Sequence, residues 1–254
     1  MSSRPPCELL PWDSELFGRR LARLLAPRLD RDLLAEVERW CAERAVDGLY
    51  FLADPADPAT AALAEEAGFR LVDVRVTLGQ ALPASRPAPA VAGVAIRPAR
   101  PEDVPALRAL AAVAHTDSRF YYDLHFARER CDALFAAWIE KSCLGEAAEA
   151  VRVAEIGGRP AGYVTCLLPA AEEERHGRIG LFAVAAAARG RGVGSLLVAA
   201  ALEWFAERGA ERVSVVTQGR NVRAQRLYQR AGMATERVEL WFHRWFTDAR
   251  QGAA

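Results

Sequence analysis

One stretch of the chain, residues 178–195, constrains the fold more than any other. Its sequence is RIGLFAVAAAARGRGVGS. Residues 179–184 carry no charge and are mostly apolar, which predicts a buried strand. A turn of small residues follows at 185–188, then a glycine-rich segment, then a helix that we expect to span residues 195–208. In this order of strand, glycine-rich turn and helix, the helix N-terminus can bind a phosphate because its first amides are unpaired.

The glycine spacing separates three kinds of phosphate loop. A GxGxxG dinucleotide fingerprint is excluded, because the third glycine is misplaced whether the count starts at Gly190 or at Gly192. A GxxxxGK[ST] loop is excluded because the only lysine is Lys141. The pattern [QR]xxGx[GA] matches from Arg189 to Gly194. The match resembles the pyrophosphate loop of the GNAT superfamily, the acetyl-CoA-dependent N-acetyltransferases. A glycine-rich helix cap without a ligand remains the alternative.

A second segment strengthens this resemblance. Residues 221–233, NVRAQRLYQRAGM, are similar to the NxxAxxLYxxxGF segment of GNAT enzymes and follow the loop at the right distance. The resemblance covers residues 94–246. It implies an α/β fold of mixed-sheet, α+β character, the GNAT acetyltransferase fold.

Composition narrows the classes of function. The 254 residues allow one large domain or two small ones, and 33 basic against 33 acidic residues argue against a nucleic-acid partner. The start, MSSRPPCELLPWDSE, lacks an apolar signal core, and the apolar run at 193–201 is too short to cross a membrane. Five cysteines without a CxxC pair indicate free thiols rather than disulfides or a metal site. We therefore expect a cytoplasmic protein without a metal or a membrane partner; a homodimer is left open.

Apolar spacing and turn residues predict the remaining elements. The expected helices are 31–44, 56–67, 101–114, 128–142 and 222–231. The expected strands are a short one near 9–10, then 16–25, 48–53, 69–78, 94–97, 150–156, 159–168, 212–217 and 233–246. Gly157-Gly158 predicts a hairpin. The Pro- and Ala-rich residues 80–93 predict a linker between a small N-terminal α/β domain, 1–79, and a GNAT domain, 94–247.

The N-terminal part carries a weak internal repeat. Residues 49–69 align with residues 213–233, and Asp57 then falls opposite Asn221. In the same alignment Ala64 occupies the position of Tyr228. This predicts that the first domain resembles a truncated GNAT half without the glycine loop and the tyrosine. Any strand, helix, glycine and strand unit would give a similar alignment.

The resemblance implies roles for individual residues. The CoA pyrophosphate would lie on the loop and the helix start, and the pantetheine arm would pair with the preceding strand. For this the strand at 179–184 must separate from the strand at 212–217 and leave a cleft, in which an amide such as that of Val184 would polarise the thioester. Asn221 would cap its helix and contact CoA. The implied donor-site residues are Phe182, Ala183, Val184, Arg189, Gly190, Arg191, Gly192, Val193, Gly194, Ser195 and Asn221. Tyr228 would act as the general acid; its alternative is a core tyrosine.

A general base is harder to identify. Five residues in loops could lie at the edge of the cleft: His115, Asp117, Asp123, His125 and His176. Proton transfer through water needs none of them. The sequence therefore selects no base.

Two segments bear on the acceptor. WDSELFG at 12–18 and the frame SRF…LF..WI..S within residues 118–142 resemble TDP-fucosamine acetyltransferases, which acetylate the 4-amino group of a TDP-linked sugar. The resemblance implies an acceptor site whose edge is formed by Ser118, Arg119, Phe120 and Tyr121. Arg119 would contact the diphosphate of the sugar nucleotide. Packing between the two domains is the alternative role of this loop. Another amine acceptor, such as an amino acid, a peptide N-terminus or an aminoglycoside, and a CoA-binding sensor without catalysis are the rival functions.

Overall fold

A computed structural model describes residues 5–82, 91–168 and 175–246. The strands are β1 Cys7–Leu9, β2 Leu21–Leu24, β3 Gly48–Ala53, β4 Arg70–Ala81, β5 Ala95–Pro98, β6 Ala150–Ile156, β7 Arg159–Leu167, β8 His176–Val184, β9 Arg212–Gln218 and β10 Ala234–Trp245. The helices are α1 Pro11–Phe17, α2 Arg31–Glu43, α3 Pro58–Glu66, α4 Val104–Ala114, α5 Arg128–Cys143, α6 Val193–Glu207 and α7 Val222–Arg230. None of these helices is long and apolar enough to cross a membrane.

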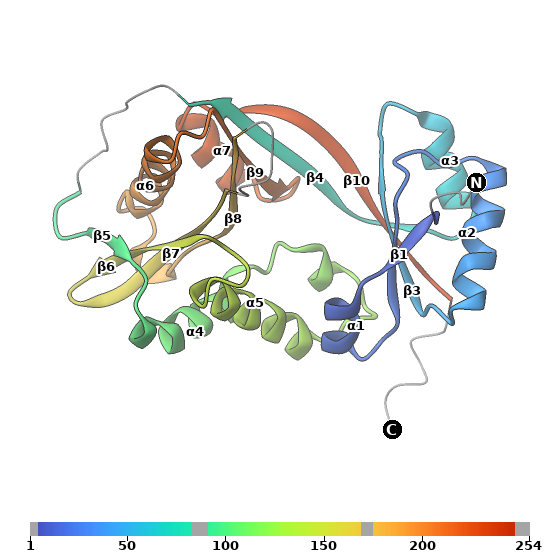
Figure 1. The fold of residues 1–254 in the computed structure, drawn as a ribbon, viewed down its shortest axis with the longest axis horizontal. Coiled ribbons are helices and arrows are strands. Elements are labelled where there is room, and N and C mark those ends of the chain that lie inside the picture. The colour runs from blue at the N-terminus through green and yellow to red at the C-terminus, as the bar shows by residue number, and fades with distance from the viewer. Residues whose placement is uncertain (1–4, 83–90, 169–174, 247–254) are drawn as a thin grey trace.

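All ten strands belong to one mixed sheet, in the order β1-β2-β3-β10-β4-β9-β8-β7-β6-β5. The predicted α/β class with a mixed sheet is therefore confirmed. The long strands β4 and β10 run across the molecule and join its two halves (Figure 1). β10 of the C-terminal half lies between β3 and β4 of the N-terminal half. The division into domains 1–79 and 94–247 stays a prediction about folding units, and 83–90 of its linker lies outside the described residues.

The internal repeat has a structural counterpart. Strands β3 and β4 flank β10, while β10 and β9 flank β4, so the units β3-α3-β4 and β9-α7-β10 interleave. Asp57 and Asn221 both cap their helices, accepting hydrogen bonds from Ala59 N and Ala224 N. Gly68 and Gly232 follow the two helices with positive φ values of 79° and 96°. These matching features support the predicted repeat.

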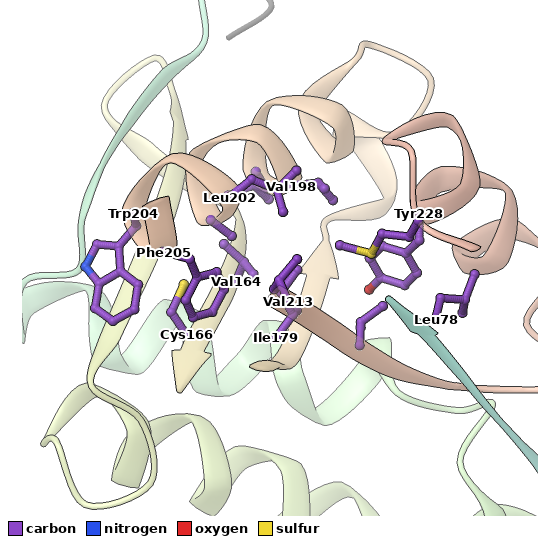
Figure 2. Close-up of a cluster of buried hydrophobic side chains, with 14 of the residues drawn as sticks. Leu78, Val164, Cys166, Ile179, Val198, Leu202, Trp204, Phe205, Val213 and Tyr228 are labelled. Atoms are coloured by element: carbon purple, nitrogen blue, oxygen red, sulfur yellow. The ribbon is translucent and has the colours of Figure 1, made fainter. Parts of the chain in front are cut away.

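Three apolar clusters fill the space around the sheet. Helix α6 covers one face, and α4 and α5 cover the other (Figure 1). Figure 2 shows the cluster under α6, with Trp204 and Phe205 at one end and Tyr228 near Leu78 at the other. The second cluster joins α4 and α5 to Tyr50 of β3 and Trp241 of β10. The third lies under α2 and α3.

The structure corrects several expected boundaries. Helix α1 occupies Pro11–Phe17, where we predicted a turn and the start of a strand at 16–25, so only Leu21–Leu24 is extended. The short α1 was missed because seven residues are too few for a helical period to stand out. Helix α6 begins at Val193, two residues before the predicted 195. The Gly157-Gly158 hairpin is confirmed, and all five cysteines are free.

Candidate active site

A cleft opens where two neighbouring strands separate. Strands β8 and β9 are parallel and pair only from His176↔Arg212 to Ile179↔Val215. Beyond these residues both strands continue, to Val184 and Gln218, but they no longer pair with each other. The resulting cleft has a volume of about 990 Å³ and is lined by residues of β8, β9, α6 and α7 and by residues 113–120. The separation predicted from the sequence is confirmed.

A bulge in β8 shapes one wall of this cleft. Val164 of β7 opposes Phe182, and Cys166 opposes Ile179, so β8 contains one extra residue between these pairs. Leu181 N donates to Thr165 Oγ1 at 2.7 Å, and Ala185 N donates to Ala161 O at 2.8 Å. Both bonds point towards β7. Because successive strand amides alternate in direction, the amide of Val184 faces the cleft.

The glycine-rich loop lies at the start of α6. Gly190 and Gly192 have φ values of +76° and +78°, a region that glycine adopts without strain. The first intrahelical bond runs from Leu196 N to Gly192 O, so the amides of Val193, Gly194 and Ser195 have no intrahelical partner. These amides can bind an anion, and the helix dipole strengthens the attraction.

Helix α7 brings Tyr228 to the opposite wall. Its first turn is capped by Asn221, whose side chain accepts from Ala224 N at 3.1 Å. Tyr228 is 3% exposed, lines the cleft and meets the ring of Phe182 edge-on at 5.9 Å. Burial raises the pKa of its phenol above the ordinary value of 10.0. Within the described part of the chain its hydroxyl has no hydrogen-bond partner.

The cleft is lined from both faces of the sheet. Phe182 and Val184 pack with α6 and Tyr228, whereas Leu181 and Ala183 pack with α4 and α5. The side with Tyr228 also carries the glycine loop. The other side carries residues 113–120. Two ligands can therefore meet in the gap between β8 and β9, one from each face.

Most of the predicted site residues line this cleft. They are Ser118, Arg119, Phe120, Phe182, Ala183, Val184, Arg189, Gly190, Gly192, Val193, Gly194, Ser195, Asn221 and Tyr228. Two predicted residues do not. Arg191 is exposed beside the loop, outside the cleft wall. The hydroxyl of Tyr121 donates to Asp132 Oδ1 at 2.7 Å, which turns this side chain towards α5.

Comparison with known proteins agrees with this geometry. Residues 110–233 match the acetyltransferase (GNAT) family model. The chain is 31% identical over 249 residues to the dTDP-fucosamine acetyltransferase of Escherichia coli O6:H1, covering 96% of this chain and 100% of that one. The chain belongs to the GNAT family. It is an acetyltransferase, and acetyl-CoA is the co-substrate of this family.

Two further proteins share parts of this likeness. The spore coat polysaccharide biosynthesis protein SpsD of Bacillus subtilis is 30% identical over 148 residues, which are 58% of this chain and 50% of that one. A GCN5-related N-acetyltransferase from Sphaerobacter thermophilus superposes with a TM-score of 0.64 at 18% identity, over 95% of this chain and 76% of that chain. The second likeness shows the fold.

Of the five base candidates in this GNAT protein, the structure brings two to the cleft, His115 and Asp117. His115 Nε2 lies 2.8 Å from the Tyr163 hydroxyl, and burial lowers the pKa of His115 to about 4. Asp123 and His125 bond to each other, away from the cleft wall. His176 lies at the first paired position of β8, opposite Arg212. No group of three metal-binding side chains exists among the described residues.

Two features of the site were missed in the sequence. Arg220 joins three segments, since it donates to Val72 O at 2.7 Å, donates to Asp117 O at 3.5 Å and lies 3.5 Å from the Tyr122 ring centre. Asp123 accepts from His243 Nδ1 at 2.7 Å and from Trp245 Nε1 at 2.9 Å. The hydrogen bonds of both features join residues more than 100 positions apart, so no local pattern could reveal them.

Positively charged side chains outnumber negatively charged ones around the cleft. Among the residues that the structure describes, Asp117 is the one acidic residue that lines it. Six arginines line it, namely Arg119, Arg178, Arg189, Arg220, Arg223 and Arg230. The whole chain has no net formal charge. The cleft is therefore the part of this acetyltransferase suited to anionic ligands.

Proposed function

We propose that this protein transfers the acetyl group of acetyl-CoA to the 4-amino group of a TDP-linked amino sugar. The observation that carries this proposal is the cleft itself, which has a helix start suited to an anion on one face and Arg119 and Arg220 beside residues 117–122 on the other. CoA and a nucleotide diphosphate sugar are both polyanions. A neutral chain that concentrates arginines in one cleft suits that pair of ligands.

The residues of the donor side fit CoA. Free amides of Val193, Gly194 and Ser195 would bind the pyrophosphate, and glycines at 190 and 192 keep side chains out of its way. The unpaired edge of β8 at Phe182–Val184 would bond to the amides of the pantetheine arm, as an added strand does. When bound, acetyl-CoA supplies the activated acetyl thioester. Asn221, at the start of α7, completes this side.

Two groups of the chain would then act on the reacting atoms. The cleft-facing amide of Val184 would donate to the thioester oxygen as negative charge grows on it. Tyr228 would give its phenolic proton to the departing thiolate. Its raised pKa keeps this phenol protonated at neutral pH, as an acid must be. The neutral acceptor amine forms the new C–N bond as the C–S bond of the thioester breaks, and its nitrogen loses one proton to solvent. The Tyr228 phenolate then takes one proton back from solvent, so charge and protons balance.

The acceptor assignment is supported by the relatives and by the loop at 118–121. The Escherichia coli relative is named for dTDP-fucosamine, and the Bacillus subtilis relative for spore coat polysaccharide biosynthesis. In this chain Ser118, Arg119 and Phe120 lie on the face of the cleft opposite the donor loop. We assign them to the acceptor. Tyr121, bonded to Asp132, would support the loop from behind.

A panel of amines tests the proposal. Thiol release from acetyl-CoA is followed with a TDP-linked 4-amino-4,6-dideoxy sugar, the same amino sugar without the nucleotide, a peptide with a free N-terminus and an aminoglycoside. We expect turnover with the TDP-linked sugar and a much lower kcat/KM without the nucleotide. Preference for the peptide or the aminoglycoside would replace the acceptor class. Binding of acetyl-CoA without any turnover would favour a sensor.

A further inference from the structure

Arg119 rests on an aromatic platform that two halves of the chain build together. Its guanidinium carbon lies 4.2 Å from the ring centre of Phe120, 4.3 Å from that of Trp241 and 5.1 Å from that of Tyr50. Phe120 itself belongs to residues 113–120, which line the cleft. Tyr50 is on β3, and Trp241 is on β10 in register with Leu52 of β3. The cation is thus held over ring faces at the meeting point of both halves.

This guanidinium has no direct counter-charge. Among the described residues no carboxylate lies within ion-pair distance of Arg119, and none accepts a hydrogen bond from it. Its Nε is buried without a partner. The nearest opposite charges, Asp13 and Asp73, act only at longer range, and Asp73 is engaged by Arg220 at 3.5 Å. A partly desolvated cation with unused donors is costly unless a ligand supplies the acceptors.

The rest of the guanidinium is open to the cleft. Arg119 lines it, and the terminal nitrogens are not shut off as Nε is. A guanidinium presents its N–H groups as a planar fork that matches two phosphate oxygens at once. The position is on the face opposite the glycine loop. An anion bound here is therefore separate from the CoA pyrophosphate.

A buried hydrogen-bond cluster fixes residues 119–123 on the part of β10 that pairs with β3 of the N-terminal half. Asp123, directly after the short turn Arg119–Tyr122, accepts from His243 Nδ1 and Trp245 Nε1 of β10. His243 is 1% exposed and stacks on Tyr50 at 4.5 Å. Its Nδ1–H donates to Asp123. The platform and the loop that carries Arg119 are therefore locked in one register.

We propose that the N-terminal half is a working part of the acceptor site, because its Tyr50, together with Trp241 of β10, holds Arg119 as the receptor for the diphosphate of a nucleotide-linked acceptor. This rests on the proposed function for the identity of the acceptor. Tyr50, Trp241 and Asp123 act as positioning residues, and Arg119 contacts the ligand. The N-terminal half thereby gains a role beyond packing.

The test uses thymidine diphosphate as the probe and the full-length protein saturated with CoA, so that the glycine loop is already occupied. Calorimetric titration should show binding to the CoA complex. We expect Arg119→Gln to weaken it by about 10- to 100-fold, the range of a lost charge-assisted interaction, while Arg119→Lys falls in between. Arg159→Gln, an exposed arginine at the β6–β7 hairpin, is the matched control and should change nothing.

A second pair of variants tests the platform. Trp241→Leu removes one ring beneath Arg119 and should raise the acceptor KM with little change in the KM for acetyl-CoA. Trp40→Leu is the control, because Trp40 also carries an arginine, Arg44 at 4.5 Å, but lies on α2, outside the cleft wall. A general loss of stability would lower the amount of folded enzyme and therefore the apparent kcat, without a selective rise of the acceptor KM. Circular dichroism confirms that each variant is folded.

The outcomes separate this inference from the proposed function. Unchanged thymidine diphosphate affinity in both Arg119 variants overturns the inference, as does a CoA complex that does not bind the probe. If acetyl transfer to the nucleotide sugar continues with an unaltered acceptor KM in Arg119→Gln, the proposed function stands and the inference fails. If no nucleotide sugar is acetylated but the probe still binds through Arg119, the anion site stands and the acceptor assignment fails.

Discussion

Ile179 and Val215 are the last residues at which β8 and β9 pair, and the strands separate immediately beyond them. This relationship creates the cleft, because backbone groups that would have joined the two strands are left for a ligand. The bulge between Ile179 and Phe182 bends β8 at the same point. Tyr228 and the glycine loop then border the gap from one face of the sheet, and residues 113–120 border it from the other.

Replacement of Tyr228 by Phe tests the acid. The variant keeps the ring that packs against Phe182 at 5.9 Å and removes only the hydroxyl. We expect kcat to fall by about 10²- to 10⁴-fold, the usual contribution of a general acid, with an unchanged dissociation constant for acetyl-CoA. Because burial raises this pKa, the wild-type kcat should show no alkaline loss from Tyr228 below the ordinary tyrosine pKa of about 10. Full activity of the variant would remove Tyr228 from catalysis.

Replacement of Gly192 by Glu tests the donor loop. The new side chain would place a carboxylate at the proposed pyrophosphate site, and its Cβ would lie 3.0 Å from Val91 Cγ2. We expect acetyl-CoA binding to be lost in calorimetric titration. Gly158→Glu is the matched control, since Gly158 also has a positive φ, +75°, but lies at a hairpin with open space around it. Normal acetyl-CoA affinity in folded Gly192→Glu protein would refute the loop assignment.

Removal of the α7 cap should affect both stability and turnover. Asn221→Ala deletes the acceptor for Ala224 N, which costs about 1 kcal/mol in the free energy of unfolding. Because α7 carries Tyr228 and Asn221 borders the donor side, the KM for acetyl-CoA should rise as well. Asp30→Ala removes the corresponding cap of α2, where Asp30 accepts from Leu33 N at 2.8 Å. This control should lose similar stability by urea unfolding and keep its kinetics.

The buried His243 should make the fold sensitive to mild acid. Burial lowers the pKa of His243 to about 4, against its hydrogen bond with Asp123, while an unfolded histidine titrates at about 6.5. The unfolded state therefore takes up a proton first as the pH falls, and stability is lost between pH 6.5 and 4. From pH 7 to 5 we expect the unfolding free energy to drop by about 2 kcal/mol from this group. In His243→Asn, which keeps a donor for Asp123, urea titrations should show a drop smaller by that amount; an equal drop would contradict the assignment.

The local features of this fold were predictable from the sequence. The glycine loop, the cap at Asn221 and the hairpin at Gly157-Gly158 each depend on a few neighbouring residues, and the structure has all three. The separation of β8 from β9 was also expected, because the resemblance implied a cleft there. These features depend on backbone geometry that short motifs specify.

The contacts between distant segments were not predictable in the same way. The insertion of β10 between β3 and β4 unites the halves that lie on either side of the predicted linker at 80–93. The aromatic platform under Arg119 brings together β3, β10 and the cleft loop. Single residues such as Tyr50 and Trp241 have no local signal for such contacts. The platform under Arg119 therefore needed the structure, whereas the glycine loop needed only the motif.

The most direct test of the central claim is acetyl transfer to a nucleotide sugar. Purified protein is mixed with acetyl-CoA and a TDP-linked 4-amino-4,6-dideoxy sugar, and the sugar product is identified by mass spectrometry and NMR. We predict an acetamido group at the 4-position, formed in step with free CoA thiol and absent with Tyr228→Phe on the same timescale. An unmodified sugar, from protein that binds acetyl-CoA normally, would contradict the account.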